Sequence, residues 1–192
     1  MRKSLLKSAF AVALVSAAVA CSRPAVQRNG LEAWADTTNV VVPEIVVDST
    51  GTLRIPPITS QGFGPVRLGL HPTMLPDTVT GVYDSLTRAI DFFDEEPYFV
   101  ASGYLRGVHT IEVMAIEDTS RVDAITVLTP AVTANIDGTK VGVGSIVKEI
   151  KHLHGVSDIP KTAIEGARLE YRDIRFYVDG DTVCAVAVGS TL

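Results

Sequence analysis

Four histidines are the residues with the clearest potential for metal or acid–base chemistry. His152 and His154 are only two positions apart, so on a helix they would point about 200° away from each other and could not hold one ion. Glu149 and His152 form an E-x-x-H pair on one helix face, but a di-metal site of that type needs carboxylates from neighbouring helices. We therefore interpret the pair as ordinary charges on a solvated face. We expect His71 to cap a turn and His109 to lie near the start of a strand.

Other short motifs predict no catalytic chemistry. The run DGDT at 179–182 lacks the later acidic ligands of a calcium loop and suits a hairpin turn. The glycines around Lys140 are not in the order of a phosphate-binding loop, and no G-x-S-x-G elbow occurs. Cys184 lies in an apolar run, where we expect a buried and unreactive thiol. The sequence thus predicts no catalytic residue, no metal site and no cofactor.

One cluster combines aromatic and acidic residues, DFFDEEPYF at 91–99. Its acidic side chains could bind a cation or a basic partner. The interpretation that we favour is a solvated helix end, from which Phe92 or Phe93 packs inward. The acidic residues of the cluster are Asp91, Asp94, Glu95 and Glu96.

The first twenty residues have the features of a secretory signal. Arg2, Lys3 and Lys7 give a positive start, and the stretch from Ser8 to Ala20 carries no charge. A membrane-spanning helix needs about 18–20 apolar residues, so this stretch is too short to span. Its apolar residues fall on all sides of a helix, which argues against a buried amphipathic helix. We predict that residues 1–20 are a signal peptide of a bacterial exported protein.

Two modes of cleavage are compatible with the sequence before Cys21. The tripeptide AVA is an A-x-A site, and cleavage after it would release a soluble periplasmic protein. The stretch also resembles a bacterial lipobox, in which the cysteine is acylated, although Ala18 stands where leucine is usual. We favour acylation, because a Cys21–Cys184 disulfide would tie a polar tail to an apolar strand. Ser22 resembles the residue found after the cysteine in lipoproteins sorted to the outer membrane.

Charge and length limit the class of partner. The chain has 17 Lys+Arg against 22 Asp+Glu, and residues 1–20 hold three of the basic residues and none of the acidic ones. The mature chain therefore keeps 14 basic against 22 acidic residues, a net charge of −8. Such a surface repels phosphate backbones, so we expect no nucleic-acid partner. The length suits one domain or two tightly joined halves.

The segment 21–60 differs from the rest of the chain. After Cys21 the run SRPAVQRNG is polar and turn-prone, as a tether between lipid and domain would be. Short β-branched runs at 40–42 and 45–47 flank Pro43. These runs would form either an edge strand, where a proline is tolerated, or an extended linker, and the sequence does not decide between them.

From residue 61 onward the chain contains two similar passages, which predict a duplication. GPVRLGL at 64–70 resembles GTKVGVG at 138–144, with an offset of 73 between Leu68-Gly69-Leu70 and Val141-Gly142-Val143. SRVDAITVL at 120–128 resembles DTVCAVAVG at 181–189, with an offset of 61. The first passage therefore carries about 12 more residues between its two motifs than the second.

An amphipathic helix is expected early in each passage. In SIVKEIKHLHG (145–155) the apolar residues recur at helical spacing, with Ser145 as N-cap and Gly155 after the last turn. In the first passage prolines interrupt the corresponding segment, and we expect the helix in VYDSLTRAIDFF (82–93) instead. Its apolar face would consist of Val82, Leu86, Ala89, Ile90 and Phe93.

Antiparallel strands are expected after each helix. In the second passage the run at 174–178 alternates like a half-buried strand, and an Asp-Gly turn then leads into the apolar run 183–188. The first passage offers strands at 108–116 and 122–128. We predict an α+β fold with two helix-then-antiparallel-meander repeats, 61–130 and 131–192, packed as one globular unit.

This order of elements resembles the tandem-repeat architecture of the β-lactamase inhibitor proteins and of the related small lipoproteins that assist outer-membrane β-barrel assembly. The resemblance covers residues 61–192 and depends on the Gly-containing motifs at 68–70 and 141–143, the helix end at 153–155 and the sheet that follows. These families typically bind other proteins through the exposed sheet face and loops. The resemblance implies a binding role and assigns no contact residue.

The prediction is a non-catalytic envelope lipoprotein that binds a protein or peptide. It would be anchored through lipid on Cys21 at the outer membrane and would face the periplasm. One alternative is a small periplasmic metal-dependent hydrolase, which requires His71, His109 or His152 to converge with carboxylates in a pocket. The other is a small-ligand-binding domain with a cavity between helix and sheet.

Overall fold

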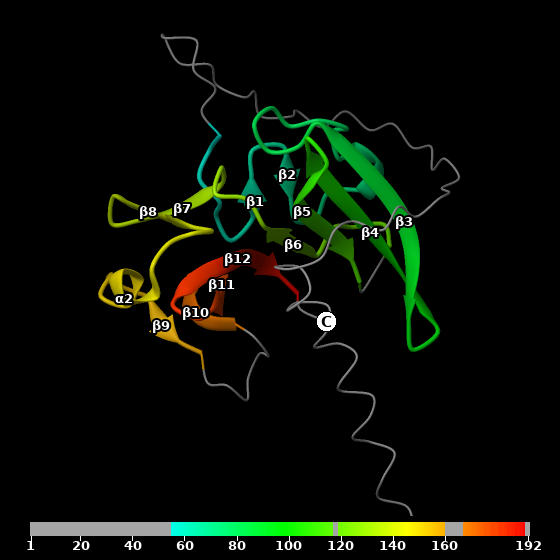
Figure 1. Ribbon diagram of the computed structural model, residues 1–192. Helices are drawn as coiled ribbons and strands as arrows, with labels where there is room; N and C mark the ends of the chain where they lie inside the picture. The colour runs from blue at the N-terminus through cyan, green and yellow to red at the C-terminus, as the bar shows by residue number, and fades with distance from the viewer. Residues whose placement is uncertain (1–54, 117–118, 160–166, 191–192) are drawn as a thin grey trace, which may run out of the picture.

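The computed structural model describes residues 55–116, 119–159 and 167–190 (Figure 1). Within these ranges the chain forms twelve strands, one 3-10 turn and one four-residue helix. The predicted signal peptide, Cys21 and the β-branched runs at 40–47 lie outside the described residues. No helix of the described part is long and apolar enough to cross a membrane.

The largest element is an antiparallel sheet of eight strands in the order β3-β4-β5-β6-β12-β11-β10-β9 (Figure 1). Four consecutive strands form each half of it, so the sheet is built from two meanders that meet in the middle. The strands are β3 (Ser85–Phe93), β4 (Glu96–Leu105), β5 (Val108–Ala115), β6 (Ala124–Val127), β9 (Ser157–Asp158), β10 (Ala167–Tyr171), β11 (Ile174–Asp179) and β12 (Thr182–Gly189).

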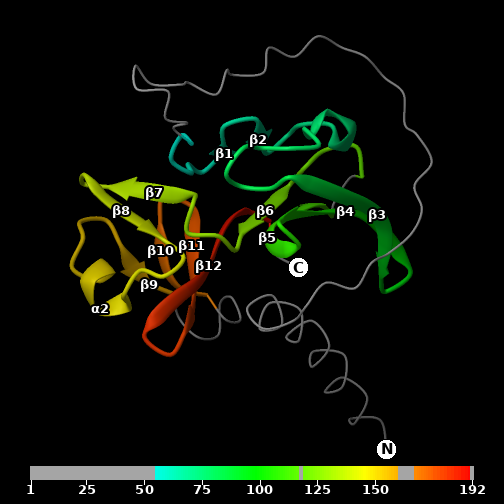
Figure 2. The same cartoon turned by 45° about the horizontal axis from the view of Figure 1, so that its top comes forward.

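A small hairpin and a short helical turn precede each meander. The first pair is the β1–β2 hairpin and the 3-10 turn η1, and the second is the β7–β8 hairpin and the helix α2. Figure 2 shows both hairpins on the same side of the large sheet. The elements are β1 (Gly62–Phe63), β2 (Val66–Arg67), η1 (Pro72–Met74), β7 (Thr133–Ile136), β8 (Thr139–Gly142) and α2 (Val147–Ile150).

The core lies between these small elements and one face of the sheet. Each central strand contributes residues at alternate positions, which is the period of side chains that point to the same face. The small hairpins add Phe63, Val66, Ile136 and Val141 from the other side. The main buried residues of the sheet are Phe99, Ala101, Ile111, Val113, Ile125, Val127, Phe176, Val186 and Val188.

The centre of the sheet has an internal pseudo-twofold axis. On β6 and β12, Thr126 pairs with Ala187, Ile125 with Val188, and Val127 with Val186. Ala187 is 61 residues after Thr126, so Thr126 pairs with the residue aligned with it at the offset of 61. Ile125 pairs with Val188, which is aligned with Val127, and Val127 pairs with Val186, which is aligned with Ile125. A twofold relation between the two strands requires this exchange.

The small hairpins follow the other offset. Phe63 pairs with Val66, and Ile136 pairs with Thr139, so both members of the first pair are 73 residues before their counterparts. The residues that the first passage has in addition form a long β3–β4 ribbon, since β3 has nine residues and β9 only two. The repeat boundaries at 61–130 and 131–192 stay a prediction.

One glycine pairing differs from the sequence alignment. The N–H of Gly69 donates to the carbonyl of Val122 (2.7 Å), and the N–H of Gly144 donates to that of Val183 (2.8 Å). The two valines are 61 residues apart, and both glycines have positive φ, 79° and 90°. The structural counterpart of Gly69 is therefore Gly144, and the match to Gly142 was wrong by two residues.

The α+β fold class is wrong, because the described residues are mostly β, with 53% of them in strands. The helix expected at 82–93 is instead the strand β3. In β3 the side chains of Leu86, Arg88 and Ile90 lie on one face, and the arginine conceals the apolar alternation. Arg88 fits this position because its guanidinium reaches Asp77 and the carbonyl of Leu75.

The second expected helix is much shorter than predicted. It covers only Val147–Ile150, and Ile146 rather than Ser145 is its N-cap residue. The Ser145 hydroxyl instead accepts the N–H of Gly142 at 3.0 Å, which closes the turn before the helix. The strand predictions at 174–178 and 183–188 are confirmed by β11 and β12, joined by the expected tight turn.

Candidate functional site

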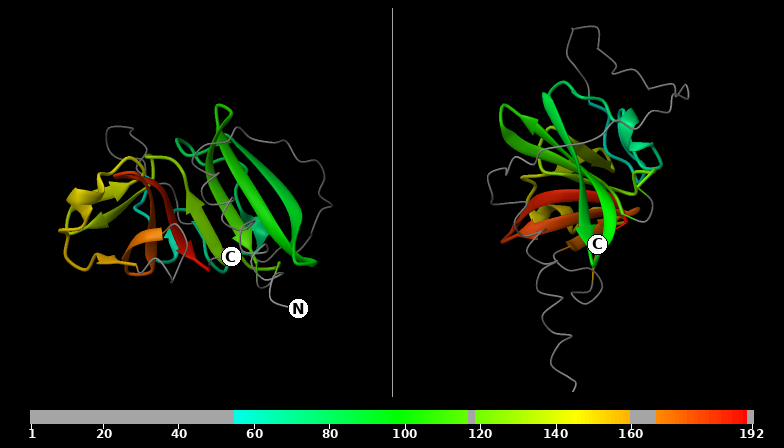
Figure 3. Two further views of the ribbon diagram at one scale, coloured as in Figure 1. Left: turned by 60° about the horizontal axis from the view of Figure 1, so that its bottom comes forward. Right: turned by 90° about the vertical axis from the view of Figure 1, so that its right-hand side faces the viewer.

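The β3–β4 ribbon extends beyond the rest of the sheet (Figure 3). Pairing of β4 with β5 begins at Phe99, opposite Ala115. The last three pairs of the ribbon, those that join residues 91–93 to 96–98, therefore have no third strand among the described residues. We call residues 91–98 the arm tip. A two-stranded ribbon is marginally stable by itself, so the arm tip is suited to contact with another surface.

Phe92 and Phe93 expose their rings at the arm tip. Phe92 is 66% exposed and Phe93 is 45% exposed. Because neighbouring residues of a strand point to opposite faces, the two rings lie on opposite faces of the ribbon. The prediction that one of them packs inward from a helix end is wrong. Among the described residues two other large apolar side chains are equally exposed, those of Val108 and Ile146, and they lie singly in separate parts of the fold.

The turn of the arm tip presents negative charge. Asp94 and Glu95 form its two central residues, with φ of 49° and 72°. A two-residue hairpin turn of this hand usually contains Asn and Gly, because most side chains disfavour positive φ. Here both residues, and Glu96 after them, are exposed carboxylates. The arm tip contains four acidic residues and no basic one.

Both edges of the arm tip are protected against pairing with another strand. On the β3 edge, the N–H of Phe92 donates to its neighbour Asp91 Oδ1 at 3.0 Å. On the β4 edge, Pro97 has no N–H to donate. Side-chain capping and proline are both means by which natural sheets prevent edge-to-edge association. The arm tip therefore offers its side chains, rather than its backbone, for recognition.

The base of the arm is fixed to the body of the protein. Arg88 Nη1 lies 2.7 Å from Asp77 Oδ1, and its Nη2 donates to the carbonyl of Leu75 at 2.7 Å. Tyr83 is fully buried, and its hydroxyl donates to the carbonyl of Pro76 at 2.9 Å. Burial raises the pKa of Tyr83, and the positive charge of Arg88 offsets this only in part. The arm thus projects from a rigid base.

Two of the four histidines have structural roles. His71 is the N-cap of η1, where its Nδ1 accepts the N–H of Thr73, so the predicted turn cap is confirmed. His109 is the second residue of β5, as predicted, and its Nε2 donates to the carbonyl of Ile111 at 3.0 Å. Burial lowers the pKa of His109, and the bond to Ile111 opposes this shift.

The residues of the metal hypothesis do not come together. The helix α2 ends at Ile150, so His152 and His154 lie in the turn after it rather than in its last turn. Both are exposed, as is Glu149. Within the described residues, no group of three or more His, Cys, Asp or Glu side chains is arranged to hold a metal ion.

Two of the remaining sequence motifs lie in or directly before the strand β12. The DGDT run forms the turn between β11 and β12, where Asp179 pairs with Thr182. This confirms the predicted hairpin turn. Cys184 lies in β12 but is half-buried rather than buried, so its expected place in the core is wrong. Cys21, the predicted site of lipid attachment, lies outside the described residues.

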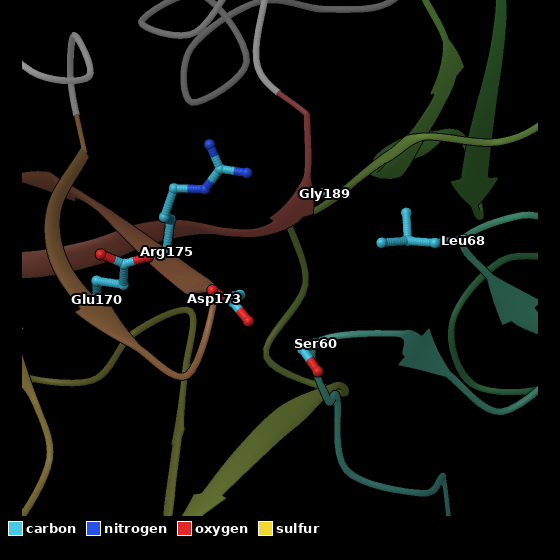
Figure 4. Close-up of a pocket in the computed structure, with 6 residues that line it drawn as sticks. All are labelled: Ser60, Leu68, Glu170, Asp173, Arg175 and Gly189. Atoms are coloured by element: carbon cyan, nitrogen blue, oxygen red, sulfur yellow. The ribbon is translucent and has the colours of Figure 1, made fainter. Parts of the chain in front are cut away.

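One pocket of about 390 Å³ lies near the ends of β10, β11 and β12 (Figure 4). The described part of its lining carries one cation and two carboxylates, and neither His nor Cys. Figure 4 shows the Arg175 side chain extending away from Asp173. Small-ligand sites are mostly apolar and have a few polar groups that converge on the ligand. Four of the six residues that line this pocket are polar or charged. The lining consists of Ser60, Leu68, Glu170, Asp173, Arg175 and Gly189.

Sequence reasoning singled out the residues of the arm tip but assigned them to a helix end. The signal that identifies them is the pair of offsets, because the extra residues of the first passage had to form some additional element. Comparisons of the chain with protein-family models, with curated proteins and with solved structures find no match.

Proposed function

We propose that the protein is a non-catalytic envelope lipoprotein that binds a partner protein through the arm tip. The observation that carries this proposal is the exposure of Phe92 and Phe93 on a ribbon that projects beyond the sheet. Aromatic side chains dominate the energetics of protein interfaces, and adjacent exposed ones are unusual on a free surface.

A protein explains the arm tip better than a lipid surface does. Exposed aromatic residues also occur where proteins touch membranes. The four carboxylates of the arm tip would, however, be repelled by the negative potential of an anionic leaflet. In this proposal the membrane is reached through lipid on Cys21, and the arm tip serves the partner.

The binding test uses two double variants with matched exposure. The mature chain, immobilised at its C-terminus, is incubated with detergent-solubilised envelope proteins, and retained proteins are identified by mass spectrometry. Phe92→Ser/Phe93→Ser removes the rings that are 66% and 45% exposed, and Val108→Ser/Ile146→Ser removes side chains that are 66% and 46% exposed. The wild type and the Val108/Ile146 variant should retain the same protein, and the phenylalanine variant should not. Equal retention by all three chains would refute the proposal.

The anchor is tested separately. An intact mass of the native protein should show the acyl groups on Cys21, and Cys21→Ala should move the protein from the membrane to the soluble fraction. An unmodified N-terminus at Cys21 would show that the A-x-A cleavage is used instead. That result would leave the binding role of the arm tip in place.

A further inference from the structure

The geometry points to a slot on the partner, with apolar walls and Lys/Arg side chains that face the turn, into which the arm tip inserts without adding a strand. This inference rests on the proposed function and specifies the chemistry of the partner. It follows from three features of the arm tip, namely its two faces, its edges and its charge.

The two phenylalanine rings project from opposite faces of the arm tip at the same level. Phe92 is paired with Pro97, and both side chains lie on the face that also carries Ile90. Phe93 lies on the other face, paired with Glu96. A flat surface could cover only one of the two rings. Burying both rings requires walls on both sides of the ribbon, which is the shape of a slot.

The edges argue against recognition by strand addition. An added strand needs free backbone donors and acceptors along the edge. The N–H of Phe92 already bonds to Asp91, and Pro97 has no N–H on the opposite edge. A partner strand on the β3 edge would have to break the hydrogen bond between Phe92 and Asp91. A partner strand on the β4 edge would find no backbone donor at Pro97. Side-chain insertion needs neither change.

The charge of the arm tip identifies the polar part of the slot. Asp94, Glu95 and Glu96 are exposed around the turn, which is the far end of the ribbon and enters the slot ahead of the rings. Carboxylates that lose water on binding are stabilised by cationic partners, and Lys or Arg at the closed end of the slot supplies them. A second copy of this chain would bring the same four carboxylates to the contact and would be repelled.

The test places a photo-activatable phenylalanine analogue at position 92 or at position 93 of the full-length protein in intact cells. Position 108 is the control, since Val108 is as exposed as Phe92 but lies at another hairpin turn. We expect both arm positions to cross-link to one and the same protein, at partner peptides that contain Lys or Arg, and position 108 not to do so. Cross-links from only one arm position would overturn the slot, while the partner protein itself would still support the proposed function.

A charge variant completes the test. In detergent-solubilised envelope extracts, where the salt concentration can be set, Asp94→Asn/Glu95→Gln/Glu96→Gln keeps both rings and should lower the initial cross-linking rate about tenfold at low salt, and by less at high salt. An unchanged rate would contradict the Lys/Arg side chains that face the turn. Cross-links to lipid or to a second copy of the chain would contradict the inference as a whole. If no position cross-links, the proposed function fails with it.

Discussion

Tyr83 and Gly103 show how single residues set the position of the arm. A Cβ at Gly103 would lie 2.9 Å from Cγ of Tyr83 and 2.5 Å from Cγ2 of Ile111. Gly103 therefore provides the space in which the tyrosine ring packs against β4. No pattern in the sequence pairs these two residues, because a glycine within a strand signals a close approach but does not name the neighbour.

Gly103→Ala should lower the free energy of unfolding by about 1–3 kcal/mol, because the added methyl group overpacks the core. Ser102→Ala, one residue away and half-buried, should change it by less than about 0.5 kcal/mol. Denaturant titration of the three chains measures both values. An equal effect of the two substitutions would contradict the packing described here.

We expect the free energy of unfolding to fall in mild acid because of His109. Burial lowers its pKa below the value of 6.5 that it has when unfolded, so the unfolded chain binds the proton more tightly. Stability should therefore be complete above about pH 6.5 and should fall as the pH drops below it toward the lowered pKa. Thermal unfolding is measured at neutral pH and at a pH of about 5. The drop in Tm between the two should be smaller in His109→Gln than in the wild type. The same shift in both chains would exclude this role.

At the level of elements, the strand β3 explains why the fold class was predicted wrongly. Leu86, Ile90 and Phe93 have helical spacing, but the same segment also alternates as a strand if Arg88 occupies an inward position. The arginine does so only because Asp77 and the Leu75 carbonyl meet it, and these contacts are tertiary. By contrast, β11 and β12 are β-branched, aromatic and apolar runs on either side of an Asp-Gly turn, and their prediction was correct.

We expect Pro97 to prevent pairing between the β4 edges of two arms. Pro97→Val would restore a backbone donor on the β4 edge, where β5 has ended. At high salt, which screens the repulsion between the carboxylates of two arm tips, this variant should form concentration-dependent oligomers in sedimentation velocity, whereas Pro130→Val, at an exposed loop position, should sediment like the wild type. A monomeric Pro97→Val variant would show that the proline does not protect this edge.

At the level of the whole molecule, the pseudo-twofold axis joins the two meanders through β6 and β12. The offset of 73 relates the pairs of the two small hairpins, and the offset of 61 relates residues that face each other on β6 and β12. The repeated pattern could therefore be recognised from the sequence alone. What the sequence could not show was the order of the strands, which depends on long-range pairing. The arm is the largest departure from the internal symmetry, since β9 has no ribbon comparable to β3.

Ile125 tests whether the two halves unfold together. Its side chain is fully buried on the central strand β6, so Ile125→Ala should cost about 2–5 kcal/mol. Because β6 pairs with β12, the whole described unit should unfold in one shifted transition by circular dichroism. Ile146→Ala, at a position 46% exposed, should cost much less. Two separate transitions in the Ile125 variant would contradict a single cooperative unit.

The most direct test of the central claim is the affinity of the arm tip for the partner identified by retention and cross-linking. Isothermal titration calorimetry would compare the wild type with the Phe92→Ser/Phe93→Ser and Val108→Ser/Ile146→Ser variants. Two interface aromatic residues should contribute at least about 2 kcal/mol, so Kd should rise by about 30-fold or more in the first variant and stay unchanged in the second. The same Kd for all three chains would show that the partner binds elsewhere and would contradict the account.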